Sequence, residues 1–181
     1  MNSLKNIWSQ FIKFIKFDKN LITQISNDRY ETANALIIVV LSILVIYLPI
    51  IITNFSSNLL DVVFYGIVDG IFAWLLSNLA IWFLLTRAFN TFTEVSNLMI
   101  FTGFSHGLVG LFGVLYFANS QITITPTYLQ VSSLIIFIWI YFVLSKSLTI
   151  SLHLENRVSS ISSVTFLVLL VWFSDPLRIF I

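Results

Sequence analysis

Three polar side chains inside otherwise apolar stretches are the residues of this sequence most able to do chemistry. Asp69 and Asn78 lie in the apolar run 62–85, and His106 lies in the next run, 98–117. If both runs are helices, Asp69 lies about 10 Å and His106 about 16 Å below the same end, because a helix rises about 1.5 Å per residue. Adjacent antiparallel helices could therefore bring them together. Such a pair could relay a proton or bind a metal ion or a polar headgroup.

The alternative for these residues is structural, and it is the interpretation we favour. A hydrogen bond between Asp69 and His106 would hold two helices together. No second carboxylate or histidine occurs at their depth, so a metal site with three protein ligands would need Asn78 or another weak ligand. The sequence also has no phosphate loop, nucleophile elbow or metalloprotease helix. We therefore expect no enzyme activity, no catalytic residues, no metal and no cofactor.

The composition indicates a membrane protein. Of 181 residues, 58% are hydrophobic and only 9% are charged, whereas soluble domains are about 45–50% apolar and about 25% charged. A net charge of +1 gives no sign of nucleic-acid binding. The chain has no cysteine, which excludes disulfides and thiolate chemistry. The bilayer is the first partner to expect.

The apolar runs predict an all-α, polytopic fold with five transmembrane helices. A spanning helix needs about 20 mostly apolar residues, and the runs are continuous rather than alternating as in a barrel. The fifth is the shortest, and Asp175 and Pro176 follow it; we expect it to span. The predicted spans, which make up a domain over 35–181, are 35–52, 62–85, 98–117, 128–148 and 158–173.

The basic residues predict the orientation. Eight of the 9 Lys and Arg residues lie in segment 1–34 or in the connections after the second and fourth spans, and only Arg178 falls on the other side. Basic loops stay in the cytoplasm. The N-terminus is therefore expected in the cytoplasm and the C-terminus outside, in what we take to be a prokaryotic cell membrane.

Segment 1–34 reads as a cytoplasmic lead-in that contains an amphipathic helix. Its apolar residues follow helical spacing, with lysines on the other side. Such a helix would lie in the inner headgroup layer; the alternative is a helix packed on the protein's own cytoplasmic loops. The apolar residues are Leu4, Ile7, Trp8, Phe11 and Ile15.

All 6 glycines lie in the second and third predicted spans. Small residues let helix backbones approach closely in lipid. We therefore expect these two spans to pack on each other more tightly than any other pair, with one stripe against the other. The stripes are Gly66, Gly70 and Ala73 on the second span, and Gly103, Gly107 and Gly110 on the third.

The chain resembles the Yip family of Rab-interacting membrane proteins, in its prokaryotic form. Three stretches carry the likeness: the lead-in 11–26, the region 73–105 with its polar aromatic turn and Gly-Phe-Ser, and the region 138–160 from a tryptophan to a polar turn. Where the family often has a proline in its third span, this chain has His106, Gly107 and Leu108. The resemblance implies five spans after a cytoplasmic segment and no catalytic residues. For eukaryotic members it implies binding of prenylated small GTPases.

Together these features predict a non-enzymatic membrane protein that organises or recruits membrane partners, or forms an oligomer. One alternative is a small transporter or channel that uses Asp69, Asn78 and His106 as a polar path. The other is an accessory subunit of a larger membrane complex. Water access to Asp69 would separate the first two.

Overall fold

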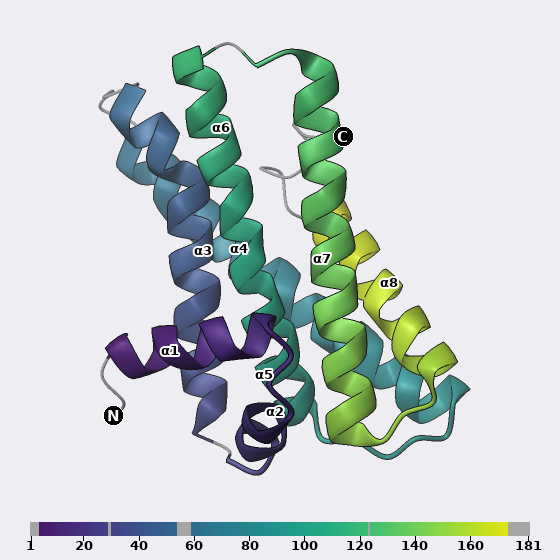
Figure 1. Cartoon of the computed structure of the whole chain (residues 1–181). Helices are drawn as coiled ribbons and strands as arrows, with labels where there is room; N and C mark the ends of the chain where they lie inside the picture. Colours follow the sequence, from purple (N-terminus) through teal and green to yellow (C-terminus); the bar gives the residue numbers. More distant parts are fainter. Residues whose placement is uncertain (1–3, 29, 54–58, 123, 174–181) are drawn as a thin grey trace.

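The protein is a helical bundle with a short pair of helices laid across it (Figure 1). The computed structural model describes residues 4–28, 30–53, 59–122 and 124–173. Of the residues that the structure describes, 89% are helical and none lies in a strand. The elements in order are α1 (Leu4–Ile15), α2 (Lys19–Ser26), α3 (Glu31–Thr53), α4 (Leu59–Phe83), η1 (Leu84–Ala88), α5 (Val95–His106), η2 (Gly107–Val109), α6 (Gly110–Ile122), α7 (Pro126–Leu152) and α8 (Asn156–Phe173).

Five helices are long and apolar enough to cross a membrane, which confirms the predicted fold class. The third of them runs from Val95 to Ile122 and combines α5, the single 3₁₀ turn η2 and α6. The fifth is 18 residues long and ends at Phe173. Asp175, Pro176 and Arg178, on which the predicted end of this span and part of the charge argument rest, lie outside the described residues.

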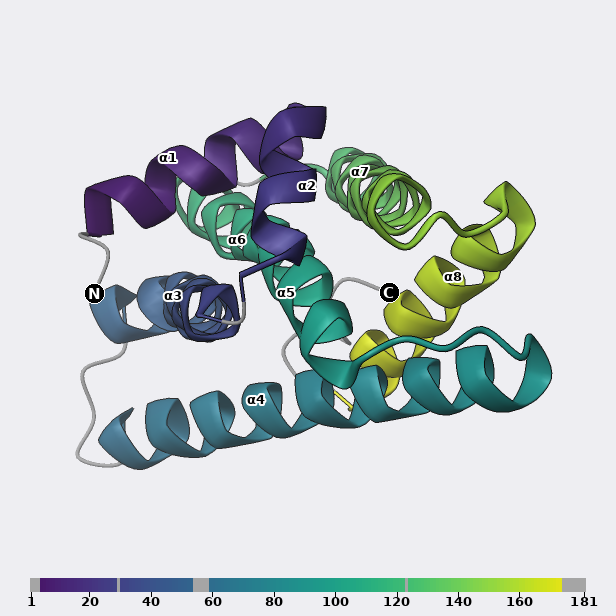
Figure 2. The same cartoon turned by 90° about the horizontal axis from the view of Figure 1, so that it is seen from below.

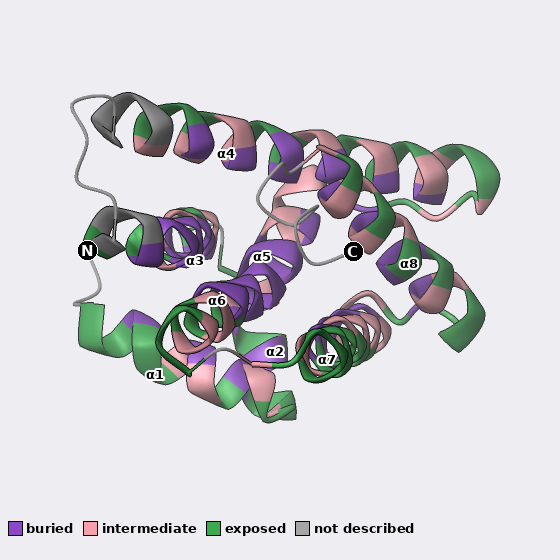
Figure 3. Cartoon of the chain, turned by 90° about the horizontal axis from the view of Figure 1, so that it is seen from above, coloured by how far each residue is buried: buried purple, intermediate pink, exposed green. Residues whose placement is uncertain are grey.

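The third span is the centre of the bundle. Within its most apolar window 72% of the residues are buried, against 28–50% for the other four spans. Burial is concentrated on α5 and the adjoining part of α6, whereas α4, α7 and α8 are buried on one side only (Figure 3). Any polar side chain on the third span must therefore find its partner inside the protein, because an unpaired polar group there is costly.

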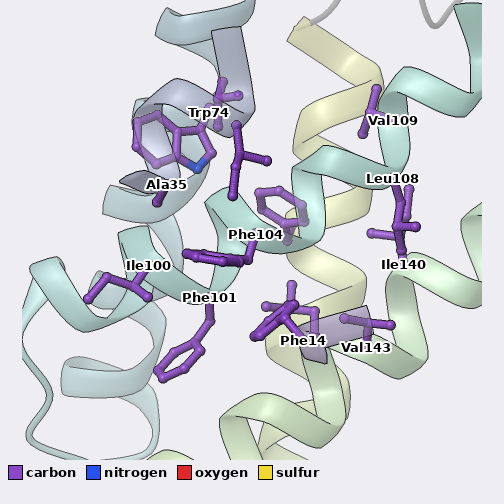
Figure 4. Packing of buried hydrophobic residues seen from close by; sticks show 14 of the residues in the cluster. Phe14, Ala35, Trp74, Ile100, Phe101, Phe104, Leu108, Val109, Ile140 and Val143 are labelled. Carbon is purple, nitrogen blue, oxygen red and sulfur yellow. The ribbon is translucent and has the colours of Figure 1, made fainter. Parts of the chain in front are cut away.

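Helices α1 and α2 form a layer on one side of the bundle, opposite α4, with α3 and the third span between them (Figure 2). Helix α1 buries Ile7, Phe11 and Phe14, and Phe14 is wholly inaccessible to solvent. The ring of Phe14 packs against Phe101 and Phe104 of α5, with centroids 6.4 and 5.2 Å away (Figure 4). The N-terminal helix thus docks on the spans themselves rather than on loops.

The contact with the bundle buries only part of the apolar face of α1. Leu4 and Trp8 remain 67% and 62% exposed on α1, beside the buried face. Both lie on the open apolar side of α1, which is the kind of surface that an amphipathic helix turns toward lipid. Helix α1 therefore has three faces: one against α5, one apolar and open, and one that carries lysines.

Helix α2 lies at the end of the bundle where α3 and α5 begin and where α4 and α7 end, whereas α1 crosses the bundle further in (Figure 1). We call the end at which α2 lies the basic end, defined by Lys19, Arg87, Lys146 and Arg157. The turn from α1 to α2 places Phe17 in the left-handed region, with φ 62°. Asp18 then caps α2 by accepting hydrogen bonds from the N–H groups of Asn20 and Leu21.

Candidate functional site

Asn78 joins α4 to the third span. Its side chain is 1% exposed, and its Oδ1 lies 2.7 Å from the Thr102 hydroxyl of α5. The same hydroxyl accepts a hydrogen bond from the indole N–H of Trp74 at 3.0 Å. The Asn78 Nδ2 donates to the Trp74 carbonyl oxygen one turn earlier in α4, at 2.8 Å. These three residues form a closed polar network between two helices.

His106 pairs with the first span, not with Asp69. Its Nδ1 lies 2.7 Å from the hydroxyl of Ser42 on α3, and both side chains are buried. The Ser42 hydroxyl also lies 2.8 Å from the Val39 carbonyl. If the hydroxyl donates its single proton to that carbonyl, then His106 carries a proton on Nδ1 and donates to Ser42. Among the described residues, the predicted Asp69–His106 bond is thus replaced by a Ser42–His106 bond.

Asp69 lies on α4 and is only half-buried. The glycines on either side of it in sequence, Gly66 and Gly70, face Tyr47 and Ile43 of α3. On α3, Ile43 and Tyr47 lie beyond Ser42, away from the basic end. The structure therefore places Asn78 and His106 at two different interfaces. Asn78 serves α4 and α5, whereas His106 serves the third span and α3.

The glycines pack against α3 rather than against each other. A Cβ atom built on Gly103 would lie 2.7 Å from the Cβ of Ala35, and one on Gly113 would lie 2.2 Å from the Val45 carbonyl oxygen. One on Gly107 would meet Phe11 of α1 as well as Ile38 of α3. The close approach in the bundle is therefore that of α3 to the third span, and the expected glycine-to-glycine contact of the second and third spans is wrong. Ala73 is fully buried on α4.

Two further polar clusters were not singled out from the sequence. Glu31, 4% exposed at the start of α3, accepts hydrogen bonds from Gln10 of α1 at 2.9 Å and from Asn34 at 2.8 Å. A carboxylate is favoured in the first turn of a helix, and here it also ties α1 to the bundle. No spacing in the sequence links position 10 to position 31, so only the fold reveals this contact.

The second cluster joins α7 to α8 through hydroxyl groups. The hydroxyl oxygens of Thr149 and Ser159 are 2.8 Å apart, and the Tyr141 hydroxyl forms a hydrogen bond with the Ser160 hydroxyl. Ser145 also reaches Ser159, at 3.4 Å. The i, i+4 spacing of Ser145 and Thr149 is the feature of the sequence that could have indicated a hydroxyl-bearing face on this helix. Hydroxyls in helices commonly bond their own backbone, however, and that spacing alone does not name a partner.

The arrangement suits helix–helix attachment. The described residues contain no group of three His, Cys, Asp or Glu side chains placed to hold a metal ion. Asn78, Thr102, Ser42 and His106 use their polar atoms across helix interfaces. No family model, no curated protein and no solved structure matches this chain. The interpretation of the site therefore rests on its geometry.

The Ser42–His106 bond predicts a specific energetic coupling. We expect Ser42→Ala and His106→Leu to lower the melting temperature in detergent. The double variant should be less destabilised than the sum of the two, because neither partner is then left unpaired. Interhelical hydrogen bonds in membranes average about 0.6 kcal/mol, so replicate melts are needed. The control cycle pairs Asp69→Asn with His106→Leu and should be close to additive. If only the control cycle showed coupling, the result would indicate that His106 pairs with Asp69 and not with Ser42.

Proposed function

We propose that this protein is a non-enzymatic membrane protein that recruits or organises partners through the exposed lysines of α1. The observation that carries the proposal is the α1–α2 layer. It is anchored by the fully buried side chains of Phe14 and Ile22, and it presents Lys5 and Lys13 to solvent. A rigidly held, exposed basic face can bind an acidic surface on a partner with little loss of its own conformational entropy.

The polar groups inside the bundle support the same proposal. Asn78 and His106, two of the residues on which a transport path would depend, are 1–2% exposed and hydrogen-bonded to neighbouring helices. They act in this proposal as structural connections. We further propose that the chain is related to the Yip family, whose members have a cytoplasmic segment before five spans. No catalytic residue or cofactor is part of this proposal.

The proposed orientation puts the basic end in the cytoplasm, in a prokaryotic cell membrane. The support is the distribution of lysine and arginine, which the positive-inside rule relates to the cytoplasmic side. Single cysteines report it directly, because the chain has none of its own. Ser9 on α1 and Ser120 near the end of α6 are both exposed. Helix α1 crosses the bundle on the side of the basic end, and α6 ends at the opposite end (Figure 1).

The test uses these two cysteines first for orientation and then for capture. An impermeant maleimide should label Ser120→Cys in intact cells, and Ser9→Cys only after permeabilisation. A photocrosslinker on Ser9→Cys should then capture a protein partner. Capture should fall at least tenfold when Lys5 and Lys13 are changed to Glu, and it should persist when they are changed to Arg.

The outcome that opposes the proposal is equally concrete. Labelling of Ser9→Cys alone in intact cells would invert the orientation. Capture that is equal from Ser9→Cys and Ser120→Cys, or that ignores the charge reversal, would remove the recruiting surface. Comigration of the captured product with one large membrane assembly would instead favour the accessory-subunit role.

A small transporter or channel is the second candidate, and buried hydroxyls favour it. Ser105 on α5 and Ser162 on α8 are fully buried, and their hydroxyls have no hydrogen-bond partner in the described part of the chain. Such groups could line a polar path through the bundle. Proton or cation flux in liposomes that Asp69→Asn abolishes would support this function over recruitment.

A further inference from the structure

Two apolar grooves adjoin on the side of the bundle that α1 crosses. The first has a volume of about 610 Å³ and lies between α1, α3, α6 and α7, with Trp8, Val45 and Val114 among its lining residues. The second, of about 670 Å³, runs along α7 beside Phe17 and Phe142. The first volume falls within the range of about 300–1,000 Å³ that is typical of small-molecule sites, and the second groove is a shallower depression that is more open to the surroundings. The residue common to both grooves is Trp139.

The lining explains why the first groove stays open. Ser42, Gly107 and Gly110, which have small side chains or none, are among its lining residues. Its wall is the open apolar face of α1, which includes Leu4 and Trp8. No ionisable side chain lines it. The groove therefore suits a flexible hydrocarbon chain rather than a polar solute.

One cation lines the second groove, and a second cation is next in sequence to a residue of that groove. Lys146 lines the second groove, and Lys16 directly precedes Phe17, which lines the same groove. Both lysines are exposed, and α1 contains no acidic residue. The carboxylate of Asp18, the nearest acid in the sequence, is occupied by the first backbone N–H groups of α2. The charge at this edge therefore complements an anion.

The spacing between cation and groove fits a lipid. Lys146 follows Trp139 by seven residues on α7, which is two turns or about 10 Å along the helix. Lysine near the end of a spanning helix places its ammonium group at headgroup level while its stem stays in apolar surroundings. The hydrocarbon grooves and the cations are thus arranged along α7 in the order of a phospholipid's chains and headgroup.

The backbone conformation of Phe17 is a second observation on the second groove. Its φ of 62° is a left-handed conformation, which is a genuine outlier for a bulky residue. Glycine would adopt it without strain, but glycine would remove the ring from the groove wall. The chain therefore keeps an aromatic side chain on the wall despite an unfavourable backbone conformation.

From these observations we propose that the two grooves form a binding site for one anionic diacyl phospholipid. One acyl chain lies in each groove, on either side of Trp139, and the phosphate lies between Lys16 and Lys146. This inference goes beyond the recruiting function and does not depend on it, since that function was assigned to Lys5 and Lys13. The lipid would fill the space under α1 and help to hold α1 on the bundle.

The test compares phosphatidylglycerol with phosphatidylcholine of the same chains, added to the full-length protein in detergent. Native mass spectrometry should show one retained phosphatidylglycerol, and a 100-fold excess over its Kd should raise the melting temperature by about 5–10 °C. Phosphatidylcholine should give less than half of that shift. The double change of Lys16 and Lys146 to Gln should remove the difference between the lipids, whereas Lys19→Gln on α2 should leave it intact.

Groove filling provides the second arm of the test. Val114→Trp should abolish retention of both lipids, while Val131→Trp, on an exposed part of α7 that lines neither groove, should not. If Val114→Trp fails to fold, Val45→Phe replaces it. Equal shifts from the two lipids with the unaltered protein would overturn the proposal, as would equal effects of Lys19→Gln and the double change. A dimer that forms through this face and excludes lipid would also overturn it.

Discussion

Replacing Gly113 with alanine should destabilise the protein more than any other single methyl group added to its glycines. The new Cβ would lie 2.2 Å from the Val45 carbonyl oxygen and 2.6 Å from its carbon, both of them backbone atoms of α3. No rotamer change can relieve such a contact, so α6 and α3 must separate. Overpacking costs about 1–3 kcal/mol when side chains can move; here we expect about 3 kcal/mol or more and a clear fall in melting temperature in detergent.

Gly110 supplies the matched control, one turn earlier on the same helix and facing the same neighbour. A Cβ there would lie 3.4 Å or more from Ser42, which is ordinary contact. Gly110→Ala should therefore be neutral, or stabilising by up to about 1 kcal/mol through its helix propensity. Gly66→Ala should fall between the two, because its close neighbour is the end of the Tyr47 side chain. Equal melting temperatures for the three variants would show that α3 and α6 do not approach closely.

These glycines also mark the limit of what the sequence could predict. Composition and run length were enough for five helices, because lipid leaves so few ways to span it. The glycine spacing correctly indicated close helix packing but not the neighbour. The facing helix, α3, is almost uniformly apolar, and nothing in it distinguishes the side that receives Gly103 and Gly113. The choice of neighbour depends on how all five helices share the available surface.

The polar residues show the same division. Position in an apolar run identified Asn78 and His106 as buried. Depth and helix order predict Asp69 as the partner of His106, whereas Ser42 has no feature in the sequence that marks it as a partner. A hydroxyl in a helix usually bonds its own backbone, and Ser42 does so as well. Its second bond, to His106, is a property of the tertiary structure.

Phe14→Ala should release the α1–α2 layer from the bundle. The Phe14 ring of α1 is fully buried and packs against the rings of Phe101 and Phe104 on α5. Loss of a buried phenylalanine costs about 3–5 kcal/mol. The layer keeps its other buried apolar side chains, which are Ile7, Phe11, Leu21, Ile22 and Ile25, so it should detach from the bundle more often while the spans keep their fold. We expect trypsin to cleave after Lys13, Lys16 or Lys19 at least tenfold faster than in the unaltered protein, with the five spans still folded.

Trp8→Ala is the control for that experiment, because it removes a larger ring from the same helix at a position that is 62% exposed. In detergent its cleavage rate should stay within about twofold of the unaltered protein. If Trp8→Ala instead released the layer as readily as Phe14→Ala, α1 would be held by its surroundings and not by α5. The two variants also distinguish binding of a partner from packing of α1 on the bundle. Because the proposed recruiting face requires a fixed α1, Phe14→Ala should lose the crosslinked partner even though Lys5 and Lys13 are unchanged.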